Sequence, residues 1–463
     1  MFTHRRVPMV LTHLRSMAFA TVVTSGCVLL SPAEARAQDG NYWTDQYGPR
    51  ASLLAGAVIG SIDDVSGTFY NPGSLALAES LPFALSTSVY EYTKVVLEDG
   101  AGRGVDLATT RTGVRPSLIA GTITSDLFGS DVLAYSVLTR TRNTSDVNAQ
   151  IIVSGADVPS GLDLEHLVGV ARIEGESSDL WAGLSYSHAF GSKFGAGLTW
   201  YGAQRSQSRR RSGIATSIAT DGSPSVIIDM GAGNYSAFRT LAKLGGYYVS
   251  GPISAGVTVT TPSAHITGSG EFGLNDVIIT SDTTALNADI QTDLDAKYKS
   301  PLSVGLGFGW QIGKTRINVS GEWFDSIDPY LVMEGEDFVS QVPGEVQSLD
   351  VVQEVDDVLN WAVGVGYSLT ESIIGYGSFA TDYSGVTDAI DRADLTIAPV
   401  DLYSALLGTE FAVERARVTL GVGYAWGSRP APTITDLIGD EGVEAQYVFK
   451  RFRVLFGFEL TTN

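Results

Sequence analysis

Alternation of apolar with small or polar residues is the feature that most constrains how this chain can fold. It is clearest in 302–312, where Leu, Val, Phe, Trp and Ile occupy every second position and Ser, Gly and Gln fill the positions between. Equivalent runs cover 359–369, 416–426 and 452–460. Successive side chains of a β-strand point to opposite faces, so each run predicts a strand with one apolar face.

The alternation recurs along most of the chain and predicts about fourteen strands. We expect them near residues 81–97, 113–124, 131–142, 178–190, 193–205, 238–250, 253–261, 301–312, 314–326, 358–369, 372–384, 403–413, 416–427 and 446–460. The gaps after even-numbered strands are tight, whereas those after odd-numbered strands are long, as at 143–177, 206–237 and 262–300. Short periplasmic turns and long outer loops are typical of outer-membrane barrels, and an even strand count places both chain ends on the periplasmic side.

A soluble β-sandwich would alternate as well, but two features favour a membrane barrel. The apolar faces carry aromatic residues near their ends, such as Trp310, Trp361 and Trp426, as interfacial girdles do. Only 17% of the residues are charged, against about 25% in typical globular domains. No apolar stretch after residue 37 approaches the roughly 20 residues that a membrane helix needs. We therefore expect an all-β, transmembrane antiparallel barrel in a Gram-negative outer membrane.

The first 37 residues have the composition of a signal peptide. Arginines precede an apolar run over 17–30, and Ala35-Arg36-Ala37 is an A-x-A site that would leave Gln38 as the mature N-terminus. A lipoprotein box at Thr24-Ser25-Gly26-Cys27 is the alternative, but Thr24 is a poor first residue for it and the apolar run continues past Cys27. Cleavage after Ala37 removes the one cysteine of the chain, so the mature protein would have neither a disulfide nor a thiolate.

Charge and motif content exclude several classes of function. With 51 acidic and 30 basic residues, the chain has no broad basic face to displace phosphate counterions, so nucleic acid is not an expected partner. After residue 37 its histidines are His166, His188 and His265, too widely spaced for a zinc cluster. A G-x-S-x-G elbow and a phosphate-binding loop are both lacking. We expect no enzyme, metal or cofactor, although a Ser–His pair assembled in three dimensions, as in a lipase, is an alternative.

Residues 38–80 precede the first strand and do not alternate. They are apolar and rich in Gly and Ala, which is too hydrophobic for a disordered tail, so we expect a plug inside or beneath the barrel. Within them, Gly56-Ala57, Asp63-Asp64-Val65-Ser66 and Asn71-Pro72-Gly73-Ser74-Leu75 follow one another. This order resembles the N-terminal signature of the FadL/TodX-type outer-membrane transporters, G-A … D-D-x-S-x-x-x-x-N-P-A-x-L. Gly73 stands where that family usually has Ala.

The resemblance implies a fourteen-stranded barrel closed by an N-terminal hatch. The chain would then divide into a signal peptide (1–37), a hatch (38–80) and a barrel with long extracellular loops (81–463). Such proteins take up long-chain fatty acids or other hydrophobic molecules, such as aromatic hydrocarbons, by passive diffusion. The ligand would enter an outer groove, pass a pocket beside the hatch and leave sideways through the wall. Expected partners are these molecules, outer-membrane lipid and lipopolysaccharide, and the barrel-assembly machinery; the resemblance favours a monomer.

Candidate site residues come from the hatch and from one strand. The hatch candidates are Phe69, Asn71, Pro72 and Gly73, although an Asn-Pro turn suits any loop. On the expected strand 131–142, Leu138, Arg140 and Arg142 share a face that begins apolar and ends in two guanidiniums. That face would suit an acyl chain and its carboxylate. Alternatively both arginines lie at the outer rim, against solvent or lipopolysaccharide phosphates.

Arg316 and Glu322 share the inward face of the strand near 314–326. Buried charges in a lumen usually pair with one another, so we expect a structural ion network there rather than a ligand site.

Passive uptake of hydrophobic molecules is the favoured function, because a plug conflicts with the open, charged channel of a general porin. The alternatives are a general porin and a non-transporting barrel that serves binding, assembly or adhesion on the same scaffold.

Overall fold

The computed structural model describes residues 35–36, 40–78, 82–99, 106–123, 131–155, 164–344, 346–347, 350–386, 400–431 and 445–460. The expected cleavage site between Ala37 and Gln38 lies outside the described residues, as does nearly all of the expected signal peptide.

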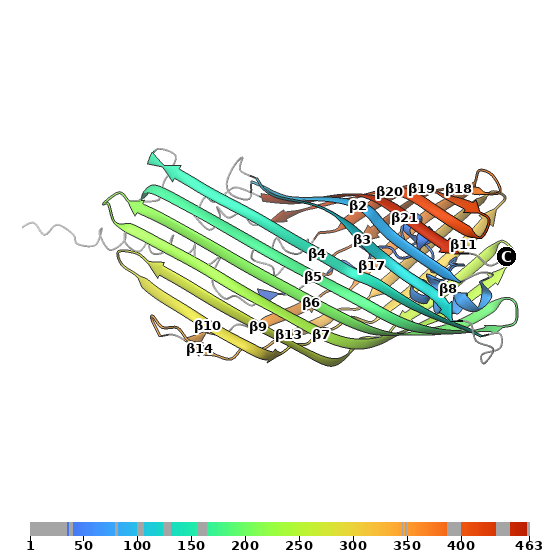
Figure 1. The fold of residues 1–463 in the computed structure, drawn as a ribbon, viewed down its shortest axis with the longest axis horizontal. Helices are drawn as coiled ribbons and strands as arrows, with labels where there is room; N and C mark the ends of the chain where they lie inside the picture. Colours follow the sequence, from blue (N-terminus) through green and yellow to red (C-terminus); the bar gives the residue numbers. More distant parts are fainter. Residues whose placement is uncertain are drawn as a thin grey trace, which may run out of the picture.

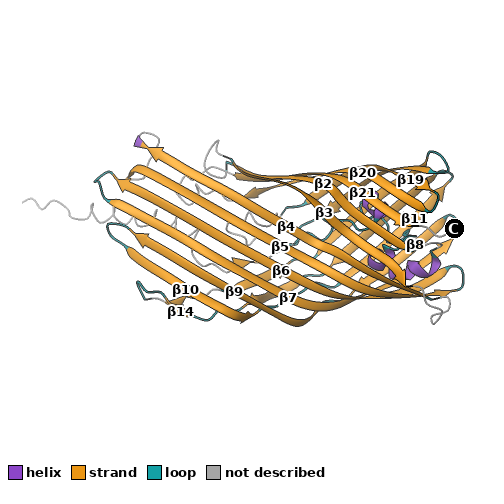
Figure 2. Ribbon diagram, in the orientation of Figure 1, coloured by secondary structure: helices purple, strands orange, loops and turns teal. Residues whose placement is uncertain are grey.

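Fourteen antiparallel strands close into a barrel within the described part of the chain (Figures 1 and 2). They are β2 (Phe83–Glu98), β3 (Leu107–Ile123), β4 (Val132–Ser154), β5 (Leu164–Phe190), β6 (Phe194–Ala219), β7 (Pro224–Ser250), β8 (Ile253–Thr260), β11 (Ser303–Ile312), β12 (Thr315–Phe324), β17 (Val358–Ser368), β18 (Ile373–Asp382), β19 (Leu402–Val413), β20 (Ala416–Ala431) and β21 (Ala445–Leu460). Each pairs with the next in this order, and β21 pairs with β2. The expected fold class is confirmed.

The two ends of the barrel differ. Phe83 of β2 pairs with Leu460 of β21 at the end that carries the tight turns, as an even strand count requires. Gly191, Gly251 and Gly313 occupy these turns with φ of 75°, 57° and 57°, a left-handed conformation that only glycine adopts without strain. We call this the hatch end and the opposite one the far end.

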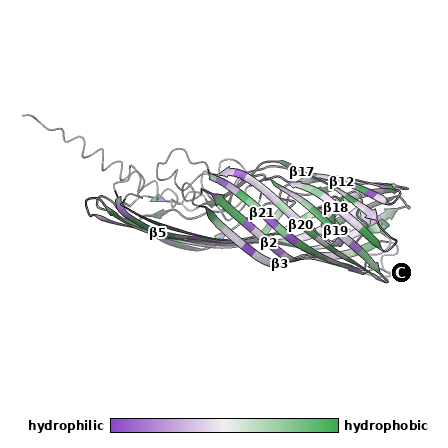
Figure 3. Cartoon of the chain, turned by 90° about the horizontal axis from the view of Figure 1, so that it is seen from above, coloured by the Kyte–Doolittle hydropathy of each residue, from purple (hydrophilic) through white to green (hydrophobic). Residues whose placement is uncertain are grey.

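Hydrophobic and hydrophilic residues are interleaved along the strands (Figure 3). Because alternate residues of a strand point away from the lumen, the outward face of the barrel is apolar. Exposed large side chains on this face include Leu184, Trp200, Leu244, Leu306, Leu359, Leu407 and Leu420. Towards the far end, Trp361, Phe379, Tyr403 and Trp426 form a chain of ring contacts, with centroids 5.6 to 6.3 Å apart. This arrangement matches the expected aromatic girdle.

Four strands are much longer than a membrane crossing requires. β4, β5, β6 and β7 have 23, 27, 26 and 27 residues, whereas a crossing strand needs about 9–11. β9 (Ala264–Ile279) pairs with the first half of β7, and β10 (Thr284–Asp295) pairs with β9. Together they form a sheet that projects beyond the far end (Figure 1). The gaps at 143–177, 206–237 and 262–300, expected as loops, are therefore largely strand.

The hatch comprises α2 (Pro49–Leu53), α3 (Gly67–Tyr70) and the 3-10 helix η1 (Pro72–Leu77). No described helix has the length and apolar content to span a membrane. Leu53, Leu54, Val58, Ile59 and Ile62 of the hatch are fully buried and belong to one apolar cluster with inward wall residues. The hatch therefore supplies the core that the barrel wall lacks on its small, polar inner face.

The described chain enters the hatch from the far side of the lumen. Asn41 forms a bridge with Ser384, just beyond the far end of β18, and its Nδ2 donates to the Asp382 carbonyl at 2.7 Å. From there the hatch descends towards Phe83 at the hatch end. The described part of the hatch therefore starts near the far end of the lumen and ends beside Phe83 at the hatch end.

A small inner sheet lies above the hatch. It consists of β13 (Ile327–Met333), β16 (Val351–Val355) and β1 (Ala35–Arg36), and β14 (Phe338–Val339) pairs with β15 (Val346–Gln347) beside it. Val332 and Met333 of β13 share an apolar cluster with Tyr235, Phe272 and Tyr298. The inner sheet therefore packs across the lumen against β7 and β9.

Candidate functional site

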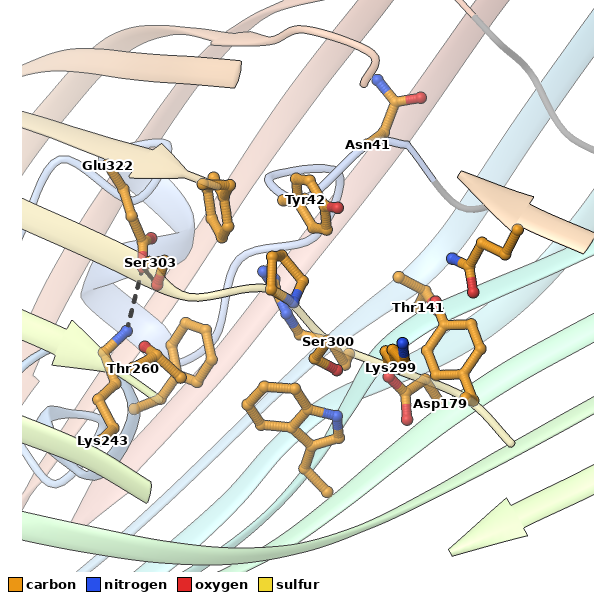
Figure 4. A pocket seen from close by; sticks show the side chains of 17 residues that line it. Asn41, Tyr42, Thr141, Asp179, Lys243, Thr260, Lys299, Ser300, Ser303 and Glu322 are labelled. Atoms are coloured by element: carbon orange, nitrogen blue, oxygen red, sulfur yellow. Dashed lines mark hydrogen bonds and ion pairs between the residues drawn. The ribbon is translucent and has the colours of Figure 1, made fainter. Parts of the chain in front are cut away.

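A cavity of about 50 Å³ lies in the lumen between the hatch and the inner sheet (Figure 4). Its lining comes from the hatch, from the inner faces of the wall and from the segment that joins β10 to β11. The lining residues are Asn41, Tyr42, Phe69, Arg140, Thr141, Asp179, Trp181, Lys243, Thr260, Tyr298, Lys299, Ser300, Pro301, Ser303, Glu322, Phe324 and Gln353.

Aromatic rings form the apolar part of this lining. Tyr42 stacks on Phe324 with centroids 4.3 Å apart and an interplanar angle of 14°. Phe69 meets the buried Tyr47 edge to face at 4.5 Å, and the Trp181 ring lies 6.3 Å from Phe69. Offset and edge-to-face contacts are the favoured geometries of such rings. These ring–ring contacts therefore fix the positions of the aromatic side chains around the cavity.

Two buried cations lie over these rings. The Arg140 guanidinium is 5.4 Å from the Phe69 centroid and 5.8 Å from that of Trp181. Lys243 Nζ is 4.7 Å from the Phe69 centroid. Cation–π contacts of this kind are strongest where water is excluded, so Phe69 holds both cations beside the cavity.

Two carboxylates balance part of this charge. Glu322 accepts from Ser303 Oγ at 2.7 Å and from Trp43 Nε1 at 3.0 Å, and it lies 3.5 Å from Lys243 Nζ. Asp179 is engaged by Arg239 at 2.5 Å. The expected ion network around Glu322 is therefore present, and it ties the hatch to the wall.

Two hydrogen-bond donors beside the cavity, Arg140 and Trp181, have no carboxylate partner among the described residues. Arg140 donates to the Tyr47 hydroxyl at 3.3 Å and forms no ion pair with a carboxylate among the described residues. Trp181 Nε1 is buried and lacks a hydrogen-bond acceptor in the same set of residues. A buried, unpaired donor is costly, so such a site favours a ligand that brings an acceptor.

The six candidate residues separate into two groups. Phe69 and Arg140 line the cavity, which places Arg140 in the lumen rather than at the outer rim. Leu138 is buried in the core that hatch and wall share. Asn71, Pro72 and Gly73 lie away from the cavity, against the inner faces of β6, β7 and β8.

The Asn-Pro turn fixes the hatch to the wall. Asn71 Nδ2 donates to the carbonyls of Ile59 and Gly246, both at 3.0 Å, while its Oδ1 accepts from the Gly73 amide at 3.1 Å. A Cβ at Gly245 would lie 2.3 Å from Asn71 Oδ1, so only glycine permits this approach. These contacts give the Asn-Pro turn a structural role.

An ion cluster holds the start of the hatch. Asp45 lies 2.6 Å from Arg115, 3.4 Å from Arg453 and 3.8 Å from Arg451, all on the wall. Burial alone would raise the pKa of Asp45, but the three guanidiniums outweigh it and hold this pKa below its ordinary value. Asp45 is therefore ionised and is the carboxylate that three wall arginines share.

The Asp63-Asp64 pair of the hatch signature divides its tasks. Asp63 contacts Arg50 of the hatch and lies 3.7 Å from Arg316 of β12. Asp64 instead accepts from the Ser66 amide at 2.7 Å and stabilises the turn before α3. Burial raises the pKa of Asp64, whereas for Asp63 the effect of burial is outweighed by the two guanidiniums, which lower the pKa. Asp63 thus links the hatch to the wall, whereas Asp64 stabilises a turn within the hatch.

The barrel wall has a seam between β3 and β4. The two strands pair only where 118–123 face 133–138, and no backbone pairing joins them further towards the far end in the part of the chain that is described. Arg111 and Arg115 of β3 reach across and donate to the carbonyls of Thr144 and Arg142. Side chains, rather than a strand ladder, therefore close the wall there, next to Arg140.

Several lining residues were not anticipated from the sequence. Lys243 and Asp179 lie on inward faces that otherwise carry small or polar residues. A charged residue on such a face is a signal from which these two lining residues could be found in the sequence. Trp181 was missed because aromatic residues were assigned to the outer girdle, yet it points into the lumen. Tyr298 lies in a connection without periodicity, so nothing in the sequence placed it.

Fold and site together define a plugged β-barrel with an aromatic and cationic cavity beside the plug. Its fold is that of the FadL/TodX-type outer-membrane transporters. The Pseudomonas putida toluene transporter TodX superimposes with a TM-score of 0.56 at 12% identity, over 89% of this chain and 98% of that one. The Ralstonia pickettii toluene transporter TbuX gives 0.55 at 11% identity over 90% and 98%, and a Pseudomonas aeruginosa FadL homologue 0.51 at 12% over 91% and 99%.

These neighbours are described as transporters or homologues of one, which agrees with the expectation that the chain is not an enzyme. Comparison with family models and with curated proteins gives no match. At such low sequence identity the likeness establishes the fold, and it agrees with the resemblance seen in the hatch signature.

Proposed function

We propose that this protein is a passive outer-membrane channel for hydrophobic molecules that carry a carboxylate, such as long-chain fatty acids. The observation that carries the proposal is Arg140, a buried guanidinium beside the cavity that forms no ion pair with any carboxylate of the described residues. A carboxylate would accept from Arg140 and from Trp181 Nε1. The apolar part of the molecule would lie along Phe69, Tyr42 and Phe324.

Neutral aromatic hydrocarbons are the second candidate. Two structural neighbours are toluene transporters, and the cavity is rich in rings. A neutral ligand, however, would exclude water from Arg140 without supplying a counter-charge, and a desolvated charge without a partner is unfavourable. The charge of the site therefore supports a carboxylate over a hydrocarbon.

The size of the cavity bears on how transport would proceed. Its volume of about 50 Å³ is well below the roughly 150 Å³ of a cavity that holds benzene. Tyr42 lines the cavity from the hatch and stacks on Phe324, so a ligand larger than the cavity would have to displace this ring. Binding would then displace this segment, which supports a gated channel rather than an open porin.

The orientation follows from the shape of the molecule. The hatch end, with its tight turns, would face the periplasm, and the projecting sheet would lie outside the cell. The exposed Arg142 at the far side of the seam is a candidate contact for lipopolysaccharide phosphate. A ligand beside Arg140 would leave sideways through the seam between β3 and β4. One chain supplies the hatch, the cavity and the seam.

Uptake by liposomes that contain the purified protein tests the charge preference. Arg140→Met removes the proposed carboxylate partner, and a charge-assisted hydrogen bond contributes about 1.5–3 kcal/mol. We expect oleate uptake to fall about 10- to 100-fold, while toluene uptake changes little. Arg172→Met is the matched control, because Arg172 is half-exposed on the outer surface. Equal effects on oleate and toluene, or no effect on either, would contradict the proposal.

Cross-linking tests the seam. The mature chain is expected to lack cysteine, so Thr112→Cys on β3 and Asn143→Cys on β4 would be its only thiols. Joining them with a bifunctional maleimide should block oleate uptake, and cleaving a reducible linker should restore it. Full uptake with the linker in place would exclude this route, without bearing on the carboxylate preference.

A further inference from the structure

The outward face of the projecting sheet is divided into bands. Leu180, Gln204 and Phe238 lie side by side on β5, β6 and β7 and form the last row of the apolar membrane band. The next row is polar: Ser178, Ser206, Ser236 and Ser269 lie in register on β5, β6, β7 and β9. A polar belt therefore begins where the membrane band ends.

Beyond this belt the outward face becomes apolar again. Val170, Ile214, Ile228, Val277 and Leu286 form one row in register across β5, β6, β7, β9 and β10. The adjacent row holds Ile152, Val168, Thr216, Val226 and Ile279. We call these two rows, together with Ile218, the distal patch.

The distal patch is open to solvent and uncharged. Ile152 is 65% exposed, Val170 49% and Ile214 42%. The charged side chains of the belt below pair among themselves, as Arg172 does with Asp146 at 2.8 Å and with Glu174 at 2.7 Å. A contiguous exposed apolar surface of this kind marks an interaction site.

Membrane lipid is too far away to cover the distal patch. Ten residues separate Phe238 from Ile228 on β7, which is about 33 Å along a strand. At a strand tilt of about 40°, the patch stands roughly 25 Å above the edge of the membrane band. Its occupant must therefore come from outside the bilayer.

We propose that the distal patch is the contact surface between two copies of this chain that stand side by side in the same membrane. Copies in one membrane share one orientation, so a two-fold axis relating them must run along the membrane normal. Such an axis brings together surfaces of equal height. The distal patch of one copy then meets the distal patch of the other, because both lie at the same height on the outward face of the sheet.

The shape of the sheet agrees with this arrangement. Figure 3 shows the projecting sheet edge-on as a direct continuation of the barrel wall, so two parallel barrels can approach on this side. The acidic chain, with a formal charge of −21, would otherwise repel its copy. An uncharged patch above a belt of internally paired charges minimises that repulsion.

The area of the distal patch is that of a weak contact. Its two rows together reach six strands spaced about 4.8 Å apart, which gives a width of about 29 Å, and two rows of outward residues give a height of about 13 Å. The contact would bury roughly 750 Å² over both copies, which is within the range of weak, transient interfaces below about 1,200 Å². The expectation of a monomer rests on the resemblance of the hatch signature, whereas the distal patch lies outside the hatch and the barrel.

Cross-linking in outer membranes tests the proposal in the native setting. Thr216→Cys places a thiol in the middle of the patch, and Ser428→Cys places one on exposed β20, on the opposite side of the barrel. A bifunctional maleimide should link Thr216→Cys into a species of twice the chain mass and leave Ser428→Cys unlinked. A cross-link from position 216 to a different protein, or none at all, would overturn the proposal.

The mass of the purified protein in detergent gives a second readout. Ile214→Glu would place an unpaired charge in the contact of each copy, so the dimer should weaken by about a hundredfold or more. Ser428→Glu adds the same charge on the opposite wall and should leave the dimer intact. Oleate uptake shows whether each variant is folded. A dimer that survives Ile214→Glu would exclude the distal patch as its interface.

Discussion

Replacing Asp45 by Asn should release the start of the hatch. Asp45 is the hatch carboxylate that Arg115, Arg451 and Arg453 share at 2.6 to 3.8 Å, and its side chain is 3% exposed. Removing one partner of a buried ion pair costs about 3–5 kcal/mol, because the other charges stay buried. Glu91 lies 3.5 Å from Arg115 and takes up part of this charge, so the lower end applies.

A cost of about 3 kcal/mol raises the ratio of undocked to docked hatch by roughly a hundredfold. Conductance across planar bilayers measures this ratio, because an undocked hatch opens the lumen to ions. Asp282→Asn is the matched control, since Asp282 is exposed in the turn between β9 and β10. Wild-type conductance and wild-type protease resistance of the hatch in Asp45→Asn would refute the idea that this ion cluster holds it.

Two further predictions concern the same docking. Gly245→Val should lower the stability of the hatch by about 1–3 kcal/mol in a melting experiment, because the new Cβ would meet Asn71 Oδ1. Gly113→Ala should be neutral in the same experiment, because a Cβ at Gly113 would have open space around it. Acid should also open the hatch: the pKa values of Asp45 and Asp63 lie below their ordinary 3.8, so their stabilisation is complete at higher pH and is lost as pH falls through the lowered values. Bilayer conductance should therefore rise as the pH falls below about 4; an unchanged conductance between about pH 5 and pH 3 would contradict this.

The barrel could be predicted from the sequence because its determinant is local. A strand between lipid and a packed lumen must alternate, and the run from Leu302 to Ile312 does so without exception. The tight turns at Gly191, Gly251 and Gly313 are also local features, because each glycine adopts a positive φ. Their positions in the sequence therefore mark one end of the barrel. Strand number and sidedness follow from such local features.

The projecting sheet was missed for a physical reason. Its strands have a polar outward row, such as Ser178, Ser206 and Ser236, where a membrane strand would have apolar residues. The apolar alternation that predicts a membrane strand stops where the membrane band ends, so it predicts strands that end there. The hydrogen-bonding pattern of a sheet needs no lipid, and the strands continue.

The site could be predicted only in part. Phe69 is a candidate as part of the hatch signature and Arg140 as a guanidinium on a face that begins apolar, and both line the cavity. Lys243, Trp181 and Glu322 meet there from β7, β5 and β12, and only the closure of the barrel brings these strands together. The Asn-Pro turn, the most specific motif of the chain, is instead a contact between hatch and wall.

Under the proposed function, Glu322 would link ligand binding to the hatch. It is the acceptor for Trp43 of the hatch and the counter-ion of Lys243 at the cavity. A carboxylate that enters beside Arg140 would compete for Lys243. If it also displaces Tyr42, binding and docking of the segment at Tyr42 and Trp43 would oppose each other, and by linkage each would weaken the other by the same factor. The ion network around Glu322 would then be the element through which a charged ligand acts on the hatch, and a neutral hydrocarbon has no charge with which to do so.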